Sequence, residues 1–318
     1  MKILIVDTYY DKYLKIFYKQ NPNLKNCEYD LQLKALLNSN FGTSDSYSYY
    51  LNKNNWEASD LIVNCLFLQN EWSKNKDKKI SKLISKIPHK FLKLPIIGRK
   101  LGNMNGLLDI AKEQIKAYKP EILYCQDLSF FPEEILLEIK KENNIRLIVG
   151  QIACPLPPKS FLNPYDLILT SFPHFVDRLR NYGKNCDYFK IGFDQRILSK
   201  TTQNDRDIDF SFMGGISKHH SNASKNIEYL IKNAKLQVYG YGANKLPFNS
   251  TIRRNHKGER WGLDMYNILS RTKISFNRHI NVAENNANNM RLYEATGMGS
   301  LLLTDRKDNL RELFEEDR

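Results

Sequence analysis

Short apolar runs alternate with longer amphipathic segments along most of this chain. The apolar runs predict strands, and apolar residues at helical spacing predict helices between them. The predicted strands span residues 3–7, 61–64, 122–124, 145–150, 167–170, 187–190, 209–213, 236–239, 273–276 and 301–303. Helices are expected at residues 28–39, 47–50, 107–118, 133–143 and 288–296, with another that begins near residue 173. This alternation is typical of mostly parallel α/β sheets.

A polar stretch between Ile191 and Arg206 interrupts the alternation, and we place a linker there. The prediction is an N-terminal Rossmann-like domain over residues 1–192, a linker over 193–206 and a C-terminal Rossmann-like domain over 207–318. A chain of 318 residues with 42% hydrophobic residues is long enough to form two such cores. We expect the ligand site in a cleft between two facing sheets, because domain interfaces commonly hold ligands.

Composition and cysteine spacing narrow the class of protein. No apolar run is long enough to cross a bilayer, and the first residues lack the long apolar core and cleavage site of a signal peptide. The five cysteines, at positions 27, 65, 125, 154 and 186, form no CxxC pair. We therefore expect reduced, mostly buried thiols in a cytoplasmic protein.

The formal net charge of +13 raises the hypothesis of a nucleic-acid-binding protein. Lysine is spread along the chain, however, and there is no helix-turn-helix, zinc-finger or RNA-binding signature. Basic residues are densest over residues 74–100, where Ile80, Leu83, Ile84 and Ile87 form one helical stripe. One interpretation is a helix docked by this stripe with its lysines in water. The other is a peripheral contact with an anionic membrane at the inner surface.

The segment around residues 288–300 combines polar groups that suit a nucleotide sugar. Asn288 and Asn289 lead into a predicted helix that carries Arg291 and Glu294. A helix start offers free backbone N–H groups and the positive end of the helix dipole, both of which suit a phosphate. Arg291 and Glu294 are three residues apart and share one helix face. They predict an arginine for the diphosphate and a carboxylate for ribose hydroxyls, unless the helix is an ordinary one with solvated charges.

Glycine or polar residues follow the other predicted strands of the second domain. Gly214 and Gly215 follow the first of these strands, and their lack of a Cβ would let the backbone approach an anion closely. Tyr239 and Gly240 end the next strand, where the tyrosine either stacks on a nucleobase or belongs to the core. His279 is among the polar residues at the exit of the third strand. Because open α/β sheets bind ligands beyond the carboxyl ends of their strands, these residues belong to the predicted donor site.

Several segments of the chain resemble the CgeB-like glycosyltransferases of the GT-B fold. The most specific likeness is the run Ala287–Gly297, ANNMRLYEATG. Further segments similar to these proteins are Phe41–Ser48, Leu68–Trp72, Tyr124–Leu128, Val149–Ala153, Trp261–Tyr266, Ser275–Asn277 and Thr304–Asp305. The resemblance covers nearly the whole chain. It implies a GT-B fold, with a nucleotide-sugar donor held by the second domain and an acceptor held by the first.

The same resemblance assigns roles to residues of the second domain. It implies that Glu294 binds the donor ribose hydroxyls, while Arg291 is suited to stabilise the charge that develops on the diphosphate. Related retaining enzymes carry a further glutamate where this chain has Asn286, so inversion and retention both stay open. Family members continue beyond the equivalent of residue 318, and we expect the second domain to be incomplete. No metal or cofactor is implied beyond the nucleotide-diphosphate sugar, which is a substrate.

An inverting transfer needs a base near the acceptor hydroxyl. Asp45, Asp127 and His174 are candidates, because each lies at a predicted strand exit or helix start of the first domain. Asp45 and His174 are equally suited to capping a helix.

The predicted function is a hexosyltransferase-like glycosyl transfer from a nucleotide sugar to a glycan, lipid-linked or protein acceptor, in surface polysaccharide or glycoconjugate synthesis. Two alternatives stay open at this point. One is a basic nucleic-acid-binding α/β protein, and the other is a two-domain nucleotide-sugar epimerase.

Overall fold

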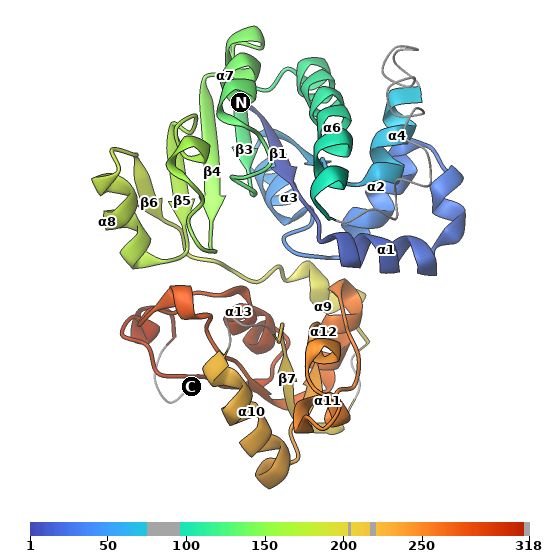
Figure 1. Ribbon diagram of the computed structural model, residues 1–318, viewed down its shortest axis with the longest axis vertical. Helices are drawn as coiled ribbons and strands as arrows, with labels where there is room; N and C mark the ends of the chain where they lie inside the picture. The colour runs from blue at the N-terminus through green and yellow to red at the C-terminus, as the bar shows by residue number, and fades with distance from the viewer. Residues whose placement is uncertain (75–95, 203–204, 217–220, 315–318) are drawn as a thin grey trace. The chain divides into compact units, whose positions relative to one another are not determined.

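The computed structural model describes residues 1–74, 96–202, 205–216 and 221–314, and it divides into two compact units. The first unit comprises Met1–Ile152, Leu156–Leu169 and Leu179–Asp187, and the second comprises Ala153–Pro155, Thr170–Arg178 and Tyr188–Arg318. Each unit is a parallel sheet with helices, so the predicted α/β class with two Rossmann-like domains is confirmed (Figure 1). The last boundary between the two units lies after Asp187, before the predicted linker. The predicted linker contains a short helix, α9 (Arg196–Lys200).

The first unit contains a six-stranded sheet in the order β2-β1-β3-β4-β5-β6. Its strands are β1 (Lys2–Asp7), β2 (Glu57–Ile62), β3 (Ile122–Cys125), β4 (Leu147–Ile152), β5 (Leu167–Thr170) and β6 (Cys186–Tyr188). Its helices are α1 (Asp11–Gln20), α2 (Tyr29–Asn38), α3 (Ser46–Lys53), α4 (Leu66–Lys74), α6 (Ile96–Tyr118) and α7 (Glu133–Glu142), with 3₁₀ turns η1 (Pro22–Asn26) and η3 (Lys159–Phe161). Helix α8 (Pro173–Asn181) follows β5, and its residues up to Arg178 belong to the second unit.

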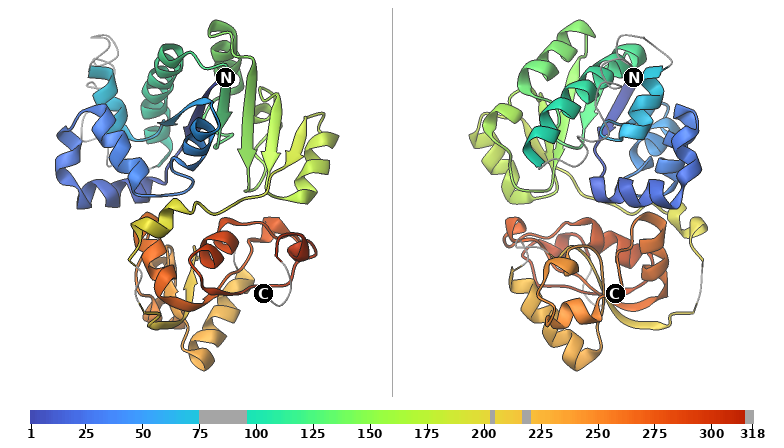
Figure 2. Two further views of the ribbon diagram at one scale, coloured as in Figure 1. Left: turned by 180° about the vertical axis from the view of Figure 1, so that it is seen from behind. Right: turned by 45° about the vertical axis from the view of Figure 1, so that its right-hand side comes forward.

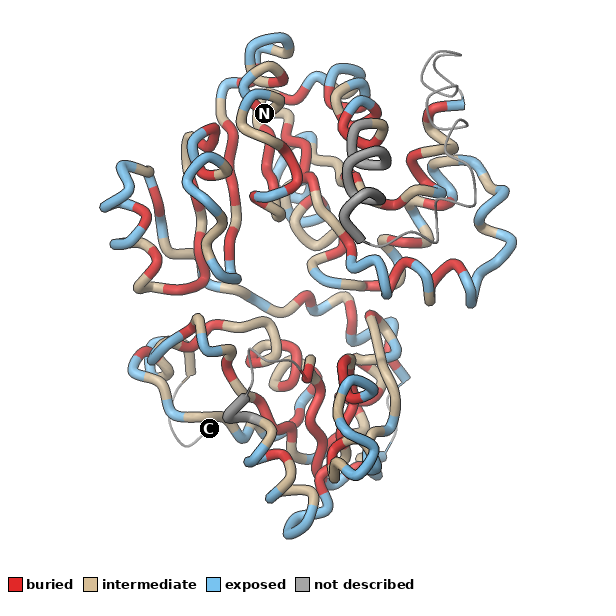
Figure 3. Tube along the Cα trace, in the orientation of Figure 1, coloured by how far each residue is buried: buried red, intermediate tan, exposed pale blue. Residues whose placement is uncertain are grey.

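The side chains of β1 point alternately to the two faces of this sheet, and helices pack on both faces. Ile3 and Ile5 point to one face, where they form a cluster with Tyr124 of β3 and with Tyr47 and Leu51 of α3. Helices α6 and α7 lie over the opposite face (Figures 1 and 2). Because both faces are covered, the inner strands are buried along most of their length (Figure 3).

The second unit contains a four-stranded parallel sheet in the order β10-β9-β7-β8. Its strands are β7 (Ile208–Met213), β8 (Gln237–Tyr239), β9 (Thr272–Phe276) and β10 (Leu301–Leu303). Its further helices are α10 (Ser221–Ala234), α11 (Thr251–Asn255), α12 (Gly262–Arg271) and α13 (Met290–Gly297), with 3₁₀ turns η5 (Ala243–Lys245), η6 (Asn281–Ala283) and η7 (Leu310–Glu312). Phe210, Phe212, Val238 and Phe276 form the centre of one core cluster.

Each sheet has one place where the strand order reverses. In the first unit the chain passes from β1 to β2 on one side and then returns to place β3 on the other side of β1. In the second unit β8 and β9 lie on opposite sides of β7 in the same way. The crevice at the carboxyl ends of such diverging strands is the usual ligand site of open α/β sheets. The fold therefore directs attention to the ends of β1 and β3, and to the ends of β7 and β9.

Strand β10 forms an outer edge of the second sheet. Leu301 and Leu303 expose 66% and 46% of their surface, whereas the strands inside the sheet are mostly buried. Leu301 and Leu303 point to the same face of β10, so that face is apolar and exposed, and β9 is the neighbour of β10 in the described part of the chain.

Other predictions from the sequence have mixed outcomes. All five thiols are free, and Cys65, Cys125 and Cys186 are buried, as expected. Among the described residues, no helix combines the length and the apolarity needed to cross a bilayer. The apolar stripe of the basic segment falls within residues 75–95, outside the described residues.

Candidate functional site

The predicted helix start at residues 288–291 exists, and its two charged residues form a buried pair. Asn289 occupies the N-cap position of α13 and makes no capping hydrogen bond with its side chain. Arg291 Nη1 lies 2.7 Å from Glu294 Oε2, with the two side chains only 15% and 9% exposed. The alternative of an ordinary helix with solvated charges is therefore excluded for these two residues.

Further contacts tie this ion pair to β7 and α12. Arg291 Nε donates to the carbonyl oxygen of Met213 at 3.1 Å, immediately before Gly214. The Tyr266 hydroxyl donates to Glu294 Oε1 at 3.2 Å. Burial, and then the neighbouring Glu294 carboxylate, raises the pKa of Tyr266 well above its ordinary value, so the hydroxyl keeps its proton and stays a donor. The arginine predicted for the diphosphate thus lies at the end of the strand that leads into the glycine pair.

Close backbone contacts explain why glycine is needed on both sides of this strand end. A Cβ atom on Gly240 would lie 2.0 Å from the carbonyl oxygen of Gly214, and the φ of Gly240 is +117°. A Cβ on Gly242, whose φ is +96°, would lie 2.1 Å from the carbonyl oxygen of Ile216, whereas a Cβ on Gly215 would meet only the end of the Tyr241 side chain. The loops after β7 and β8 therefore run side by side, and only residues without a Cβ permit that approach.

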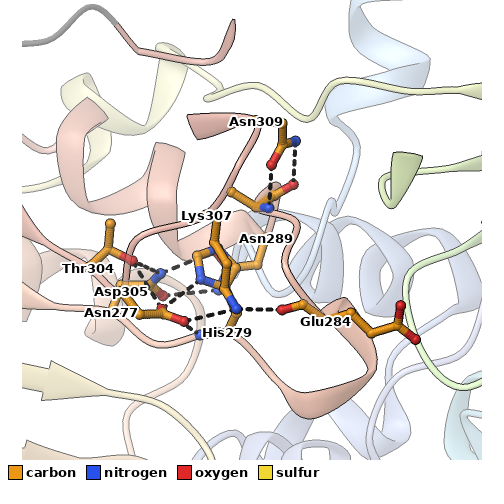
Figure 4. A network of polar contacts seen from close by, with 9 residues as sticks. Asn277, His279, Glu284, Asn289, Thr304, Asp305, Lys307 and Asn309 are labelled. Carbon is orange, nitrogen blue, oxygen red and sulfur yellow. Dashed lines mark hydrogen bonds and ion pairs between the residues drawn. The ribbon is translucent and has the colours of Figure 1, made fainter. Parts of the chain in front are cut away.

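A polar network connects the loops after β9 and β10 with the start of α13 (Figure 4). Asn277 and Asn289 exchange side-chain hydrogen bonds of 3.0 and 3.4 Å, and Asn277 also donates to Thr304 Oγ1 at 2.9 Å. His279 Nδ1 lies 2.8 Å from Asp305 Oδ1, and Lys307 Nζ lies 3.2 Å from Asp305 Oδ2. The network fixes the loops at the carboxyl ends of β9 and β10 next to the helix start.

His279 belongs to this network through its ring nitrogen Nδ1. Its side chain is fully buried, and Nε2 has no hydrogen-bond partner among the described residues. The ring of His279 links the loop after β9 to Asp305, and its contact with a donor stays a prediction.

Two other predicted donor-site residues form side-chain hydrogen bonds within the protein. Asn288 is fully buried; its amide donates to Tyr188 Oη and to the carbonyl of Phe189, and its oxygen accepts from Tyr293 Oη. Its side chain therefore anchors the segment around Tyr188 rather than offering an amide to a phosphate. Tyr239 packs among core residues and donates its hydroxyl to Gln237, so the core interpretation holds for it.

The three predicted base candidates lie in different surroundings. His174 belongs to the second unit, where its Nε2 contacts the Val282 carbonyl at 3.0 Å and its Nδ1 lies 2.8 Å from the Asn286 amide nitrogen. Both ring nitrogens are engaged, and burial lowers the pKa of His174, which argues against its predicted acceptor-side role. Asp45 occupies the N-cap position of α3 but makes no capping bond with its side chain.

Asp127 lies at the carboxyl end of β3, as predicted, and its carboxylate is held on both sides. Oδ2 accepts from Thr8 Oγ1 at 2.8 Å, and Oδ1 accepts from the Ser129 backbone N–H at 2.9 Å. The interaction with Thr8 places Asp127 next to Asp7, the last residue of β1. Asp7 was not among the predicted site residues. Its signal is related to the one that pointed to His279, since both are polar residues near the carboxyl end of an apolar strand.

The structure therefore assembles two groups of polar residues, one at the reversal point of each sheet. In the second unit, Arg291, Glu294 and the glycine pair meet where β7 ends and α13 begins. In the first unit, Asp7 and Asp127 meet at the ends of β1 and β3. Tyr266 was missed from the sequence because a tyrosine inside an amphipathic helix gives no functional signal of its own.

Comparison with known proteins finds a similarity to one family in part of the second unit. Residues 221–318 match a family described as "Glycosyl transferase-like". This segment contains α12, α13 and the Arg291–Glu294 pair, so the second unit carries a glycosyltransferase-like region. A search among curated proteins found no match to the chain.

Solved structures with a similar course of the chain share little sequence with it. The UDP-GlcNAc 2-epimerase from Neisseria meningitidis, bound to UDP-GlcNAc, has 11% identity and a TM-score of 0.48 over 98% of this chain and 85% of its own. The UDP-GlcNAc 2-epimerase from Methanocaldococcus jannaschii, in complex with UDP-GlcNAc and UDP, has 11% identity and a TM-score of 0.46. That match covers 99% of this chain and 87% of the epimerase. AviGT4, a glycosyltransferase involved in avilamycin A biosynthesis, has 12% identity and a TM-score of 0.45 over 65% of this chain; the match spans 61% of AviGT4, less than two thirds of its length.

Proposed function

We propose that this protein is a glycosyltransferase that takes a sugar from a nucleotide-diphosphate donor held by the second unit. The acceptor is proposed to be a hydroxyl of a glycan or lipid-linked glycan bound by the first unit. The observation that carries the proposal is the buried Arg291–Glu294 pair, set against the Gly214–Gly215 loop within the glycosyltransferase-like segment.

The chemistry of transfer explains the need for a fixed cation at this place. As the bond between sugar and phosphate breaks, negative charge grows on the departing diphosphate. A cation held in position lowers the barrier because it needs no reorganisation when the charge appears. Arg291 is held by Met213, Met265 and Glu294, so its guanidinium is already oriented.

Glu294 has hydrogen-bonding capacity left for a ligand. An ionised carboxylate offers about four lone-pair sites, and Arg291 and Tyr266 use one site on each oxygen. A pair of neighbouring ribose hydroxyls could donate to those that are left. Burial strengthens such bonds, because water competes less well for the same acceptor sites.

The backbone at the start of α13 supplies the remaining donors. The N-cap side chain of Asn289 is turned to Asn277 instead of capping the helix. Free N–H groups of the first turn are then available to the diphosphate, where the helix dipole also favours negative charge. In this proposal Asn277, His279 and Asp305 act by holding the surrounding loops in place.

Calorimetric titration of the full chain with UDP, GDP, dTDP and CMP tests the donor site. We expect one of these nucleotides to bind, and Glu294→Gln to weaken binding about tenfold or more, since a hydrogen bond to a charged group contributes about 1.5–3 kcal/mol. Gln is preferred to Ala because it still accepts from Tyr266 and fills the same volume.

Asp209→Asn is the matched control, because Asp209 is an exposed carboxylate at the opposite end of β7. The control should bind as the wild type does. Unchanged affinity in Glu294→Gln, with an unfolding midpoint near that of the wild type, would contradict the donor site. Interconversion of a free nucleotide sugar without transfer to water or an acceptor would favour an epimerase instead.

A further inference from the structure

The carboxyl ends of β1 and β3 form a second place in the molecule where a ligand is expected. The strand order of the first sheet reverses between these two strands, and Asp7 is the last residue of β1. The backbone N–H of Gln126 donates to the carbonyl of Val6, which keeps the segment after β3 in register with the end of β1. Open α/β sheets bind ligands at such a reversal point.

The side chains around Asp7 are polar, and the structure shows which elements supply them. Asp127 follows β3, Tyr124 lies within β3, Tyr47 comes from α3, and Tyr9 follows β1; each interacts electrostatically with Asp7. Asp60 of β2 interacts with the Tyr9 hydroxyl and accepts a hydrogen bond from Ser48 of α3. Among the groups that shift the pKa of Asp7 in the described residues, none is a cation.

Two buried hydrogen-bond donors on the segments that follow β1 and β3 have no acceptor in hydrogen-bonding geometry among the described residues. The Tyr9 side chain is 2% exposed, and its hydroxyl has no well-aligned partner among the described residues, although Ser44 is beside it. The side-chain amide nitrogen of Gln126 is buried and likewise has no partner there, while its oxygen accepts from Thr43. Buried donors of this kind are costly without a partner, so they point to a ligand that supplies oxygen atoms.

The pKa of Asp7 is close to neutral pH, so its carboxyl group can take up and release a proton there. Burial raises its pKa to about 7; the hydrogen bond from the Thr8 backbone N–H opposes this rise, and the charge of Asp127 adds to it. A base with a pKa close to the working pH combines a useful ionised fraction with a good driving force for proton uptake. Asp7 is partly exposed as a residue, whereas its carboxyl group is largely removed from water, which is the main reason that its pKa is raised.

We propose that Asp7 is the catalytic base, which accepts the proton of the attacking hydroxyl of a sugar or other polyol acceptor bound at the ends of β1 and β3. This inference rests on the proposed function and adds the identity of the base and the place of the acceptor. Asp127 acts as a positioning residue, since it holds Thr8 and adds negative charge beside Asp7.

The proposed step balances without any further reactant. The acceptor oxygen forms a bond to the anomeric carbon as its proton moves to Asp7. The bond from that carbon to the diphosphate oxygen breaks, and its electron pair leaves with the nucleoside diphosphate. Asp7 then releases the proton to solvent. Attack from the side opposite the leaving group makes this an inverting transfer.

Release of nucleoside diphosphate tests the proposal with water as the acceptor. The probes are UDP-glucose, UDP-N-acetylglucosamine, GDP-mannose and dTDP-glucose, each incubated with the full chain between about pH 5 and 9. We expect the wild-type rate to rise with pH through an apparent pKa near 7. Asp7→Asn should lower the rate at least about 100-fold, within the range usual for general base catalysis, while donor affinity changes less than about twofold.

Asp127→Asn tests the positioning role of Asp127 through the pH dependence of the rate, which would not change if Asp127 only supported the fold. Removal of the neighbouring negative charge should lower the pKa of Asp7, so the acid limb of the rate profile should move to lower pH. Carboxyl ¹³C NMR titration of the wild type and Asp127→Asn should show the same displacement for Asp7 in the absence of ligand.

The variants are expected to fold, because burial disfavours the charged form of Asp7 and Asn removes that charge. Asp11→Asn, an exposed acidic residue in the first turn of α1, is the control and should behave as the wild type. If a donor binds and Asp7→Asn turns it over at the wild-type rate, the assignment of Asp7 is overturned and the donor site stands. If none of the nucleotide sugars binds, the proposed function itself fails.

Discussion

At the scale of single residues, the donor-side group depends on side chains that hold one another. Arg291 and Glu294 are both largely removed from water, and each is the main counter-charge of the other. Removing one partner of a buried pair leaves the other charge unsolvated, at a cost of about 3 kcal/mol or more. A neutral isostere of Glu294 therefore separates the loss of a ligand contact from the loss of the fold better than truncation does.

Glycine at position 240 is required by two independent features of the backbone. We expect Gly240→Ala to lower the free energy of unfolding by more than about 2 kcal/mol, because a non-glycine residue at positive φ costs about 1–2 kcal/mol and the added methyl would also meet the Gly214 carbonyl. Denaturant unfolding followed by circular dichroism measures the change.

Gly183→Ala is the matched control for this substitution. Gly183 also has a positive φ, +77°, but a Cβ there would meet nothing within 4 Å. The control should lose only the backbone part of the stability. Equal losses in the two variants would show that the approach of the two loops does not contribute.

At the scale of elements, the loops after β9 and β10 are joined by charge. His279 lies against Asp305, and Lys307 contacts the same carboxylate and the backbone carbonyl of Glu284. Burial by itself would raise the pKa of Asp305, but the hydrogen bonds and charges of His279 and Lys307 outweigh it and hold that pKa below its ordinary value. The carboxylate therefore stabilises the two loops in its ionised form.

This pairing makes a prediction about pH. The pKa of Asp305 is lower in the folded state than in the unfolded state, where it is about 3.9. Its contribution is therefore complete above about pH 5 and is lost as the pH falls toward the folded pKa. We expect Asp305→Asn to lower the unfolding free energy by about 1–2 kcal/mol at pH 7, a value reduced for partial exposure, and by clearly less at pH 3.

Urea unfolding at several pH values between 3 and 7 measures this difference. Asp308→Asn, at an exposed aspartate nearby in the chain, is the control and should show little effect at any pH. A difference between Asp305→Asn and the wild type that stays constant over this range would contradict the ionic role of Asp305.

At the scale of the whole molecule, the net charge of +13 is not matched by a nucleic-acid motif. The polar groups that the fold gathers at the reversal point of the first sheet include the carboxyl groups of Asp7 and Asp127, whose negative charge would repel a phosphate backbone. A small anionic donor held by one arginine and a helix start is the more consistent partner for the second unit.

Salt dependence separates these two kinds of partner. Binding of a nucleoside diphosphate, with about two phosphate contacts, should weaken less than about tenfold between about 50 and 200 mM NaCl, because few counterions are released. A protein that contacts 6–10 phosphates of a nucleic acid loses about 10³–10⁵ in affinity over the same range. Titrations with UDP and with a fluorescent oligonucleotide at both salt concentrations measure the two slopes. Steep, tight oligonucleotide binding without UDP binding would support the nucleic-acid alternative.

Most elements of the fold could be predicted because their apolar runs are buried on both sides. The ends of β1, β3, β7 and β9 follow from the sequence within one or two residues. Strand β2 was predicted at residues 61–64 but spans Glu57–Ile62, because only its last residues are fully buried and carry the apolar signal. Helix α1 was not expected, although Tyr13, Leu14, Phe17 and Tyr18 bury one of its faces.

The site was predictable where chemistry is local in the sequence, and not where it depends on distant partners. Arg291 and Glu294 lie three residues apart on one helix, so their pairing follows from helix geometry. Asn288 has the same local signal, but its partners near Tyr188 come from a part of the chain that no spacing rule connects to it. The environment of Asp7 depends in the same way on α3 and β3, which pack against the end of β1 only in the folded protein.

The outer strand β10 has a practical consequence for anyone who handles this protein. An apolar strand edge with open backbone groups is a template on which another chain can add a strand, which is the first step toward aggregation. The charged run Asp305–Asp308 follows the three leucines after one threonine, Thr304, and charges beside an apolar strand oppose such stacking. Repulsion between copies that each carry a high positive charge reinforces it, and salt weakens that repulsion. Concentrated stocks should therefore stay clear longest in buffers of low ionic strength.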